Sequence, residues 1–260
     1  MLQGRNAVVT GSTSGIGLGI ARALAAQGCN VMLNGFGDVK EIEKLRAALA
    51  AEYKVKAAYS AADMTKPADI RGMVVSAARE LGGVDILVNN AGIQHVAPIP
   101  EFPEDKWDQI IAINLSSAFH ASKAAVPLMR AAGWGRVVNI ASAHGLVASA
   151  FKSAYVTAKH GLLGFTKVLA LETARENITC NAICPGYVRT PLVDKQVDDQ
   201  ARAHGIPRER VISDVILKPQ PSGRFVEVEE VGALAVFLCS EAGKSVTGAA
   251  LSMDGGWTAA

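Results

Sequence analysis

Short apolar segments alternate along this chain with longer segments whose apolar residues recur at helical spacing. The strand-like segments are residues 7–10, 31–33, 85–88, 136–140 and 178–183, with weaker ones at 55–59 and 248–253. Strands that are apolar on both faces belong in a parallel sheet with helices packed on each side. Their alternation with helices, joined by right-handed crossovers, predicts a doubly wound sheet. We therefore expect residues 1–260 to form one α/β domain with a Rossmann-like, seven-stranded parallel sheet and helices on both faces.

One segment, residues 190–224, departs from this alternation. It is polar and charged, and five helix-breaking residues interrupt it before an apolar helix resumes at 231–238. In an open α/β sheet the ligand crevice lies at the carboxyl ends of the strands, where this segment starts, and long connections are often functional. We expect a helical lid over a substrate. The alternative is a solvated helical excursion without a role.

Composition narrows the function classes. Of 260 residues, 50% are hydrophobic and 19% charged, with a formal net charge of +2, so neither disorder nor a general nucleic-acid surface is indicated. No uncharged apolar stretch is long enough to span a bilayer, and no secretory leader is recognisable, so we expect no membrane partner. The four cysteines lack a paired Cys-x-x-Cys spacing, which favours reduced thiols in a cytoplasmic protein. We assign no metal ligands.

A glycine-rich turn follows the first predicted strand. Its glycines, Gly11, Gly15 and Gly17, have the spacing Gly-x-x-x-Gly-x-Gly, and a helix is predicted from about Leu18. Glycines allow a tight turn and close backbone approach, and the N–H groups of a helix start attract a pyrophosphate. Such a turn can also be only a turn, but its place after the first strand favours a dinucleotide. We assign to this site Gly11, Thr13, Ser14, Gly15, Ile16 and Gly17.

The end of the second strand should distinguish NAD from NADP. An acid there would bind the ribose hydroxyls and an arginine would bind a 2′-phosphate, but residues 33–38 offer only Asp38, about one turn late. Since no basic residue is present, we favour NAD, with Phe36 beside the cofactor. Asp63, followed by Met64, is a candidate acceptor for the adenine amino group. It could equally cap the helix that follows.

Candidate chemistry lies in Ser142, Tyr155 and Lys159. Residues four apart share a helix face, so the Lys159 ammonium should sit beside the Tyr155 phenol and favour the phenolate. The Ser142 hydroxyl could hold a substrate oxygen while Tyr155 takes or returns its proton, which is general acid–base chemistry on an alcohol or carbonyl. Taken alone, a Tyr-x-x-x-Lys pair also fits an ordinary surface helix.

Together, these motifs make the chain resemble the short-chain dehydrogenase/reductases over essentially its whole length. The matching motifs, in order, are Thr10-Gly11-x-x-x-Gly15-x-Gly17, Asn89-Asn90-Ala91-Gly92, Asn114, Ser142, Tyr155-x-x-x-Lys159 and Pro185-Gly186. The resemblance implies a nicotinamide cofactor, contacted also by Asn90, Ala91, Gly92, Pro185, Gly186 and Val188. It implies that Tyr155 and Ser142 are catalytic, that Lys159 also holds the nicotinamide ribose, and that Asn114 organises a proton relay through Lys159. The alternative for Asn114 is a helix-interior asparagine bonded to its own backbone.

Within that family the chain resembles bacterial D-3-hydroxybutyrate dehydrogenases. The resemblance rests on residues 89–95, 140–149, 152–155 and 254–259. It implies that a substrate carboxylate is held by Gln94, His144, Lys152 and Gln196, and that Tyr187 and Trp257 also contact the substrate. Lys152 lies one turn before Tyr155, and on an extended backbone His144 would point the same way as Ser142. The alternatives are a snorkelling surface lysine and a structural histidine that caps a turn.

Two features depart from that group. Tyr187 stands where these enzymes usually carry tryptophan, which could enlarge the substrate pocket and admit longer 3-hydroxy acids. The segment 218–224 is more basic than expected, and we expect it to change only the surface at the trailing end of the lid.

The interpretation is an NAD-dependent enzyme that oxidises (R)-3-hydroxybutyrate to acetoacetate reversibly, with Tyr155 as the general base. One alternative is a 3-oxoacyl-thioester reductase of the same family, which would need a basic surface for its carrier. Another is a catalytically silent nucleotide sensor. The resemblance also suggests a homotetramer built through the long helices at 107–130 and 155–175.

Overall fold

A seven-stranded sheet forms the centre of the protein. The computed structural model describes residues 2–191, 193–194, 197–198, 201 and 205–259. The strands lie in the order β3-β2-β1-β4-β5-β6-β7, and every neighbouring pair is parallel. Their bounds are β1 Asn6–Val9, β2 Asn30–Asn34, β3 Ala57–Ser60, β4 Ile86–Asn89, β5 Gly135–Ile140, β6 Ile178–Pro185 and β7 Ala250–Met253. The predicted Rossmann-like parallel sheet is confirmed.

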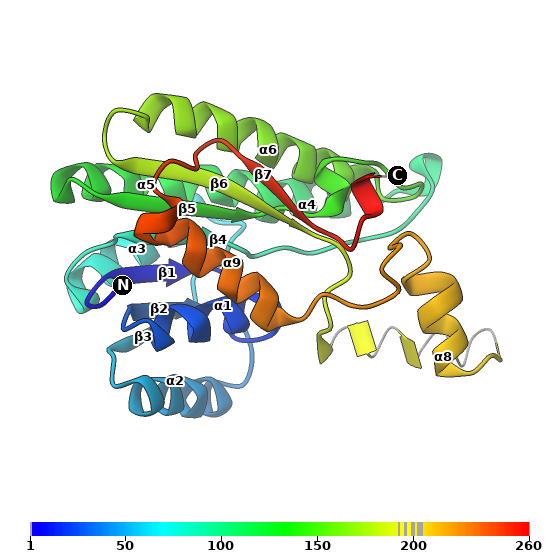
Figure 1. The fold of residues 1–260 in the computed structure, drawn as a ribbon, viewed down its shortest axis with the longest axis horizontal. Coiled ribbons are helices and arrows are strands. Elements are labelled where there is room, and N and C mark those ends of the chain that lie inside the picture. Colours follow the sequence, from blue (N-terminus) through cyan, green and yellow to red (C-terminus); the bar gives the residue numbers. More distant parts are fainter. Residues whose placement is uncertain (1, 192, 195–196, 199–200, 202–204, 260) are drawn as a thin grey trace.

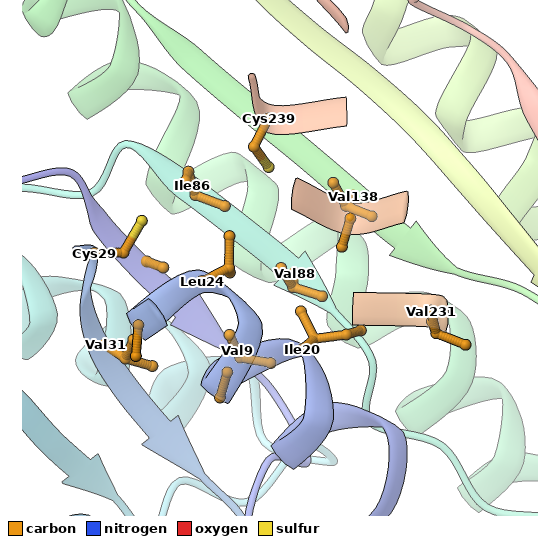
Figure 2. Packing of buried hydrophobic residues seen from close by; sticks show 14 of the residues in the cluster. Val9, Ile20, Leu24, Cys29, Val31, Ile86, Val88, Val138, Val231 and Cys239 are labelled. Carbon is orange, nitrogen blue, oxygen red and sulfur yellow. The ribbon is translucent and has the colours of Figure 1, made fainter. Parts of the chain in front are cut away.

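Helices cover both faces of this sheet (Figure 1). One face packs against α1 (Gly15–Ala26), α2 (Val39–Tyr53) and α9 (Val228–Cys239), and the other against α3 (Pro67–Leu81), α5 (Ser117–Ala132) and α6 (Ser153–Thr173). Figure 2 shows Ile20 and Leu24 of α1 and Val231 of α9 grouped with strand residues such as Val88. Because successive strand residues point to opposite faces, Val8 joins one core cluster and Val9 the other.

Local signals in the sequence mark several helix starts. The Asp38 carboxylate accepts hydrogen bonds from the main-chain N–H groups of Lys40 and Glu41 and so caps α2. Glu227 and Glu230 form a capping box at the start of α9. Helix α4 (Glu104–Ile111) runs through a π-helical turn, Ala112–Ser116, into α5. None of the helices that the structure describes is long and apolar enough to cross a membrane.

The predicted lid segment leaves the sheet after β6. It contains the short helix α8 (Arg208–Val211) and a π-helical turn, Ile212–Ile216. A parallel bridge between Val188 and Val226 brings the start and end of the excursion together. A small apolar cluster that includes Val211 and Leu217 of this segment packs against Tyr187. The α8 region lies at the same end of the molecule as the C-terminal turn (Figure 1), and its function as a lid remains a prediction.

Candidate active site

A cavity of about 610 Å³ opens at the carboxyl ends of the strands. All but two of the predicted site residues line it. These are Gly11, Thr13, Ser14, Gly15, Ile16, Gly17, Phe36, Asp63, Met64, Asn90, Ala91, Gly92, Gln94, Ser142, His144, Lys152, Tyr155, Lys159, Pro185, Gly186, Tyr187, Val188 and Trp257. Asn114 is not among the lining residues, and Gln196 lies outside the described residues. The lining also includes residues that the motifs did not identify, namely Asn34, Gly35, Ala62, Ile93, Ile113, Ile140, Ala141, Thr190, Pro191 and Val193.

The glycine turn has a shape that only glycine permits. Gly11 has φ +61°, and a Cβ there would lie 2.9 Å from Cα of Ala91. A Cβ on Gly17 would lie 2.3 Å from the carbonyl oxygen of Gly11. These two glycines therefore bring the turn against both its own helix and the loop after β4.

The start of α1 fits a pyrophosphate. The side chain of Ser14, the N-cap residue, makes no capping hydrogen bond, and the first turn carries no acidic residue. By contrast, Asp38 satisfies the N–H groups at the start of α2. Among the described residues, the N–H groups of Gly15, Ile16 and Gly17 have no main-chain partner, and with the positive end of the helix dipole they lie at the cavity that these residues line.

Asn90 braces this turn from the neighbouring strand. Its Nδ2 donates hydrogen bonds to the carbonyl oxygens of Thr10 at 2.8 Å and Gly11 at 2.9 Å. In return, Oγ1 of Thr10 accepts hydrogen bonds from the main-chain N–H groups of Asn90 and Ala91. The side chain of Asn90 thus holds the turn in shape while the residue itself lines the cavity.

Asn34, at the end of β2, is a residue that sequence reasoning missed. It is 1% exposed, and its Oδ1 accepts a hydrogen bond from the N–H of Gly11 at 3.1 Å. Its Nδ2 donates to the carbonyl oxygens of Ser60 and Ala62. A buried amide at the end of an apolar strand was the available signal, because such a group must find partners. Asp38, which was one turn late, caps α2 and does not line the cavity.

Asp63 closes a local turn just before α3, and the helix cap that was its alternative is wrong, because the N-cap residue of α3 is Lys66. Its Oδ1 accepts hydrogen bonds from the N–H and hydroxyl of Thr65, and these bonds hold the pKa of the Asp63 carboxyl below its usual range. Asp63 also lines the cavity, beside Met64. A capped turn and a contact with a nucleotide base are therefore compatible at this position.

Ser142 and Tyr155 both line the cavity, and the Ser142 hydroxyl lies near enough to the phenol to act on the pKa of Tyr155. Ser142 follows β5, and its Oγ accepts a hydrogen bond from the main-chain N–H of His144 at 3.1 Å. Nζ of Lys159 lies 5.5 Å from the centroid of the Tyr155 ring and donates a hydrogen bond to the carbonyl oxygen of Ile140 at 2.7 Å. Two hydroxyls and an ammonium group thus converge at the end of β5.

Electrostatics at this centre differ from the expectation that the ammonium favours the phenolate. Burial raises the pKa of the Tyr155 phenol above its usual value, and the nearby Ser142 hydroxyl opposes only part of that shift. Burial also lowers the pKa of the Lys159 ammonium to about 8. In the protein alone, burial is the largest cause of both shifts, and it disfavours the charged form of each group.

His144 lies in a 3₁₀ turn, Ala143–Gly145, and not on the extended backbone that was expected. The side chain nevertheless reaches the cavity, because Ser142 caps that turn and brings the imidazole alongside. Nδ1 of His144 lies 3.5 Å from Oγ of Ser142, and Nε2 lies 2.8 Å from Oγ of Ser149. Burial, together with the charges of Lys152 and His160, lowers the pKa of His144 to about 4.

Lys152 brings a cation into the same cavity. It occupies the N-cap position of α6 and is half-buried, and burial lowers the pKa of its ammonium. Among the described residues, no carboxylate lies within salt-bridge distance of its Nζ. Gln94 lines the cavity as well. A half-buried, unpaired ammonium is costly unless an anion joins it, so this end of the cavity suits a carboxylate.

Three aromatic rings form a wall beside that cation. The rings of Tyr187 and Trp257 are stacked, with centroids 5.7 Å apart and planes at 9°. Trp257 in turn meets the imidazole of His144 edge to face at 5.0 Å. These rings would exclude water and accommodate a short apolar group. We call Tyr187, Trp257 and His144 the aromatic wall.

Asn114 lies in the π-helical turn between α4 and α5 and is 2% exposed. Its Oδ1 accepts a hydrogen bond from the N–H of Ile93, and its Nδ2 donates to the carbonyl oxygen of the same residue, both at 2.9 Å. The alternative of an asparagine bonded to its own helix backbone was therefore wrong. Asn114 fixes the loop that precedes Gln94, and its part in a proton relay remains a prediction.

Comparison with known proteins agrees with this geometry. A family described as "Enoyl-(Acyl carrier protein) reductase" matches residues 11–258. A crystal structure from Sinorhizobium meliloti, named as a short-chain alcohol dehydrogenase, superposes with a TM-score of 0.88 at 37% identity and covers 100% of this chain and 98% of that one. The chain belongs to the short-chain dehydrogenase/reductase family. As a member of that family it uses a nicotinamide cofactor.

Two curated relatives are more similar in sequence. A protein of Cupriavidus necator, named D-beta-hydroxybutyrate dehydrogenase, is 59% identical over 259 residues and covers 100% of both chains. A protein of Rhizobium meliloti with the same name is 55% identical over 255 residues, which is 98% of this chain and 99% of that one. The similarity therefore extends across the whole of this short-chain dehydrogenase/reductase, including its C-terminal turn.

Proposed function

We propose that this protein is an NAD-dependent dehydrogenase that oxidises (R)-3-hydroxybutyrate to acetoacetate, reversibly. The observation that carries the proposal is the position of Lys152, a half-buried cation without a carboxylate partner among the described residues, in the same cavity as Ser142 and Tyr155. A 3-hydroxy acid needs a reacting carbon at one end and a socket for its carboxylate at the other. The names of the two relatives above, at 59% and 55% identity, support the same substrate.

The reacting end of the substrate would lie against Ser142 and Tyr155. A bound nicotinamide would supply the acceptor for the hydride that leaves C3 of the hydroxy acid, and its positive charge would favour the phenolate. The Ser142 hydroxyl donates a hydrogen bond to the substrate oxygen, while Tyr155 takes the proton of the substrate hydroxyl as general base. Lys159, 5.5 Å from the Tyr155 ring, adds positive charge and lies where it can hold the nicotinamide ribose.

The carboxylate end would lie against Lys152, Gln94 and His144. Lys152 supplies the charge and Gln94 an amide N–H. Because the pKa of His144 is lowered to about 4, its imidazole is neutral at physiological pH and contributes a hydrogen bond but no charge. Gln196, also proposed for this socket, lies outside the described residues.

The proposal of NAD over NADP rests on the adenosine end of the cavity. The lining there includes Thr13, Asn34, Gly35 and Phe36, and the described lysines and arginines that line the cavity are Lys152 and Lys159, at its other end. A 2′-phosphate would therefore meet no counter-charge.

Assembly and location belong to the same proposal. We propose a homotetramer built through the helices that follow Trp107 and Tyr155, and support comes from the exposure of Phe119 (46%), Val168 (53%) and Leu171 (80%) on them. The proposed cytoplasmic location has support from four free, buried cysteines. We also propose that residues 190–224 cover the substrate, because Thr190, Pro191 and Val193 line the cavity.

A substrate panel tests the function. Formation of the reduced nicotinamide is followed with (R)- and (S)-3-hydroxybutyrate, each with NAD and NADP, and its consumption is followed with acetoacetate and acetoacetyl-CoA. The proposal expects turnover of the (R)-acid with NAD and of acetoacetate. Faster reduction of the thioester with NADPH would identify a 3-oxoacyl-thioester reductase instead. Nucleotide binding without turnover of any of these substrates would identify a sensor.

A further inference from the structure

Gln220 lies in the 218–224 segment, whose departure in sequence was expected to affect only the surface. Instead, it is 2% exposed. Its Oε1 accepts a hydrogen bond from the main-chain N–H of Tyr187 at 3.0 Å, and its Nε2 donates to the carbonyl oxygen of Arg224 at 2.5 Å. Both ends of the amide are therefore satisfied by backbone, which makes Gln220 a fixed connection between two loops.

Two glycines leave room for this side chain. A Cβ on Gly186 would lie 2.3 Å from Oε1 of Gln220, and a Cβ on Gly255 would lie 2.7 Å from its Cγ. Main-chain hydrogen bonds join the same three segments, from the N–H of Gly186 to the carbonyl of Met253 at 3.0 Å and from the N–H of Ser222 to the carbonyl of Gly255 at 2.9 Å. Gln220 is thus inserted between the end of β6 and the C-terminal turn.

The end of β6 and the C-terminal turn each lead into one ring of the aromatic wall. Tyr187 follows Gly186 directly, and Trp257 follows Gly255 by two residues. The C-terminal turn is itself rigid, because the Asp254 carboxylate accepts hydrogen bonds from the N–H of Thr258 at 3.0 Å and from its hydroxyl at 2.6 Å. The relative position of the two stacked rings therefore depends on the contact that Gln220 makes with both loops.

We propose that Gln220 is a positioning residue that holds the Tyr187 and Trp257 rings together and so sets the length of the 3-hydroxy acid that the cavity admits. This inference rests on the proposed function. Gln220 does not line the cavity, so it acts through the rings. Ser142 follows β5 and Tyr155 lies in α6, and the hydrogen bonds of Gln220 reach neither segment, so the chemical step is spared.

The test replaces Gln220 by methionine, which has a similar length but makes neither hydrogen bond. The kcat and KM values are measured with NAD for the (R)-3-hydroxy acids of four, five and six carbons. We expect KM for the four-carbon acid to rise about 5- to 10-fold, as for a lost neutral hydrogen bond, with kcat within about twofold. KM for the longer acids should stay level or fall, and KM for NAD should not change. Gln27→Met, at an exposed glutamine at the end of α1, is the matched control.

Several outcomes would overturn the inference. One is an equal rise of KM for all three acids, and another is a fall in kcat together with a higher KM for NAD, since either indicates a general structural role. In a Trp257→Leu background, Gln220→Met should change the chain-length profile no further, and an additive change contradicts action through the wall.

If Gln220→Met does not fold, Gln220→Asn keeps the amide on a shorter side chain and should shift the profile in the same direction. A wild-type protein that turns over none of the acids refutes the proposed function, whereas an active wild type with an unchanged variant profile refutes only this inference.

Discussion

Nε2 of His144 lies 2.8 Å from Oγ of Ser149, and Nδ1 of the same ring faces Oγ of Ser142. The imidazole is therefore held between two serine hydroxyls. His144 is 5% exposed, and the nearby Lys152 ammonium adds to the effect of burial, so the pKa falls from 6.5 to about 4. The folded protein therefore keeps this imidazole neutral at a pH where the unfolded chain would protonate it. A residue of the proposed carboxylate socket therefore also makes the free energy of unfolding depend on pH in acid.

The first prediction concerns unfolding in acid. Between pH 6.5 and about 4 the unfolded chain binds more protons at this position than the folded protein, so stability falls as the pH falls through that window. The loss due to His144 should approach roughly 3 kcal/mol. Urea unfolding of the wild type and of His144→Gln, at several pH values, should show the variant losing less stability in acid. The same substitution at His120 is the control, and an identical pH dependence in wild type and His144→Gln would contradict the prediction.

The second prediction concerns Tyr155. Removal of the hydroxyl in Tyr155→Phe should lower kcat by about 10³-fold, within the range for a lost general acid–base group, while NAD still binds. Because burial raises the pKa of the phenol, oxidation by the wild type should accelerate with rising pH, since more phenolate is present. Reduction of acetoacetate needs the protonated phenol and should not accelerate. The measurement is kcat for oxidation and for reduction across about three pH units, from roughly pH 6 to 9. A variant with near-normal kcat would exclude Tyr155 as the base.

The fold and most of the cavity lining could be predicted from the sequence. Regular apolar runs indicate the strands, and short contiguous motifs indicate the residues that follow them. Contacts between distant parts of the chain were not predictable in the same way. Asn34 reaches Gly11, Ser60 and Ala62 only after three strands have assembled. Gln220 looked like part of a solvated loop, because nothing near it in sequence reveals that it packs against Gly186.

Electrostatics were also beyond the sequence. The spacing of Tyr155 and Lys159 correctly placed an ammonium near a phenol, 5.5 Å from the ring centroid. The sign of the resulting pKa shift depends on how deeply both groups are buried, and burial is a property of the assembled fold.

The third prediction tests the carboxylate socket. Loss of the ammonium in Lys152→Ala should raise KM for 3-hydroxybutyrate and acetoacetate by about 10- to 100-fold, as expected for a charge-assisted hydrogen bond. Methyl acetoacetate has no carboxylate, so its kcat/KM should be nearly the same in the wild type and the variant. Lys152→Met, which keeps an unbranched side chain, separates the charge from the packing of the stem. Equal losses for the acid and the ester would mean that Lys152 supports the fold and not the carboxylate.

The fourth prediction concerns Asn34. Replacement by leucine leaves the N–H of Gly11 and the carbonyl groups of Ser60 and Ala62 without their partners. Each unsatisfied buried group costs about 1–3 kcal/mol, so Asn34→Leu should lower the free energy of unfolding by several kcal/mol and raise KM for NAD. Thermal unfolding with and without NAD measures both effects. Unchanged affinity for NAD in a folded Asn34→Leu variant would show that the glycine turn keeps its shape without this side chain.

The last prediction concerns the choice of cofactor. Phe36 is 68% exposed and lines the adenosine end of the cavity, so a longer basic side chain fits there without repacking the core. The Phe36→Arg guanidinium would offer a bidentate partner to a 2′-phosphate and should raise kcat/KM for NADP by about 10-fold or more, while that for NAD falls less. Phe36→Leu, which adds no charge, is the control. Since the phosphate contact is ionic, the gain with NADP should shrink as salt is added, and a gain that salt does not affect would point to a packing effect instead.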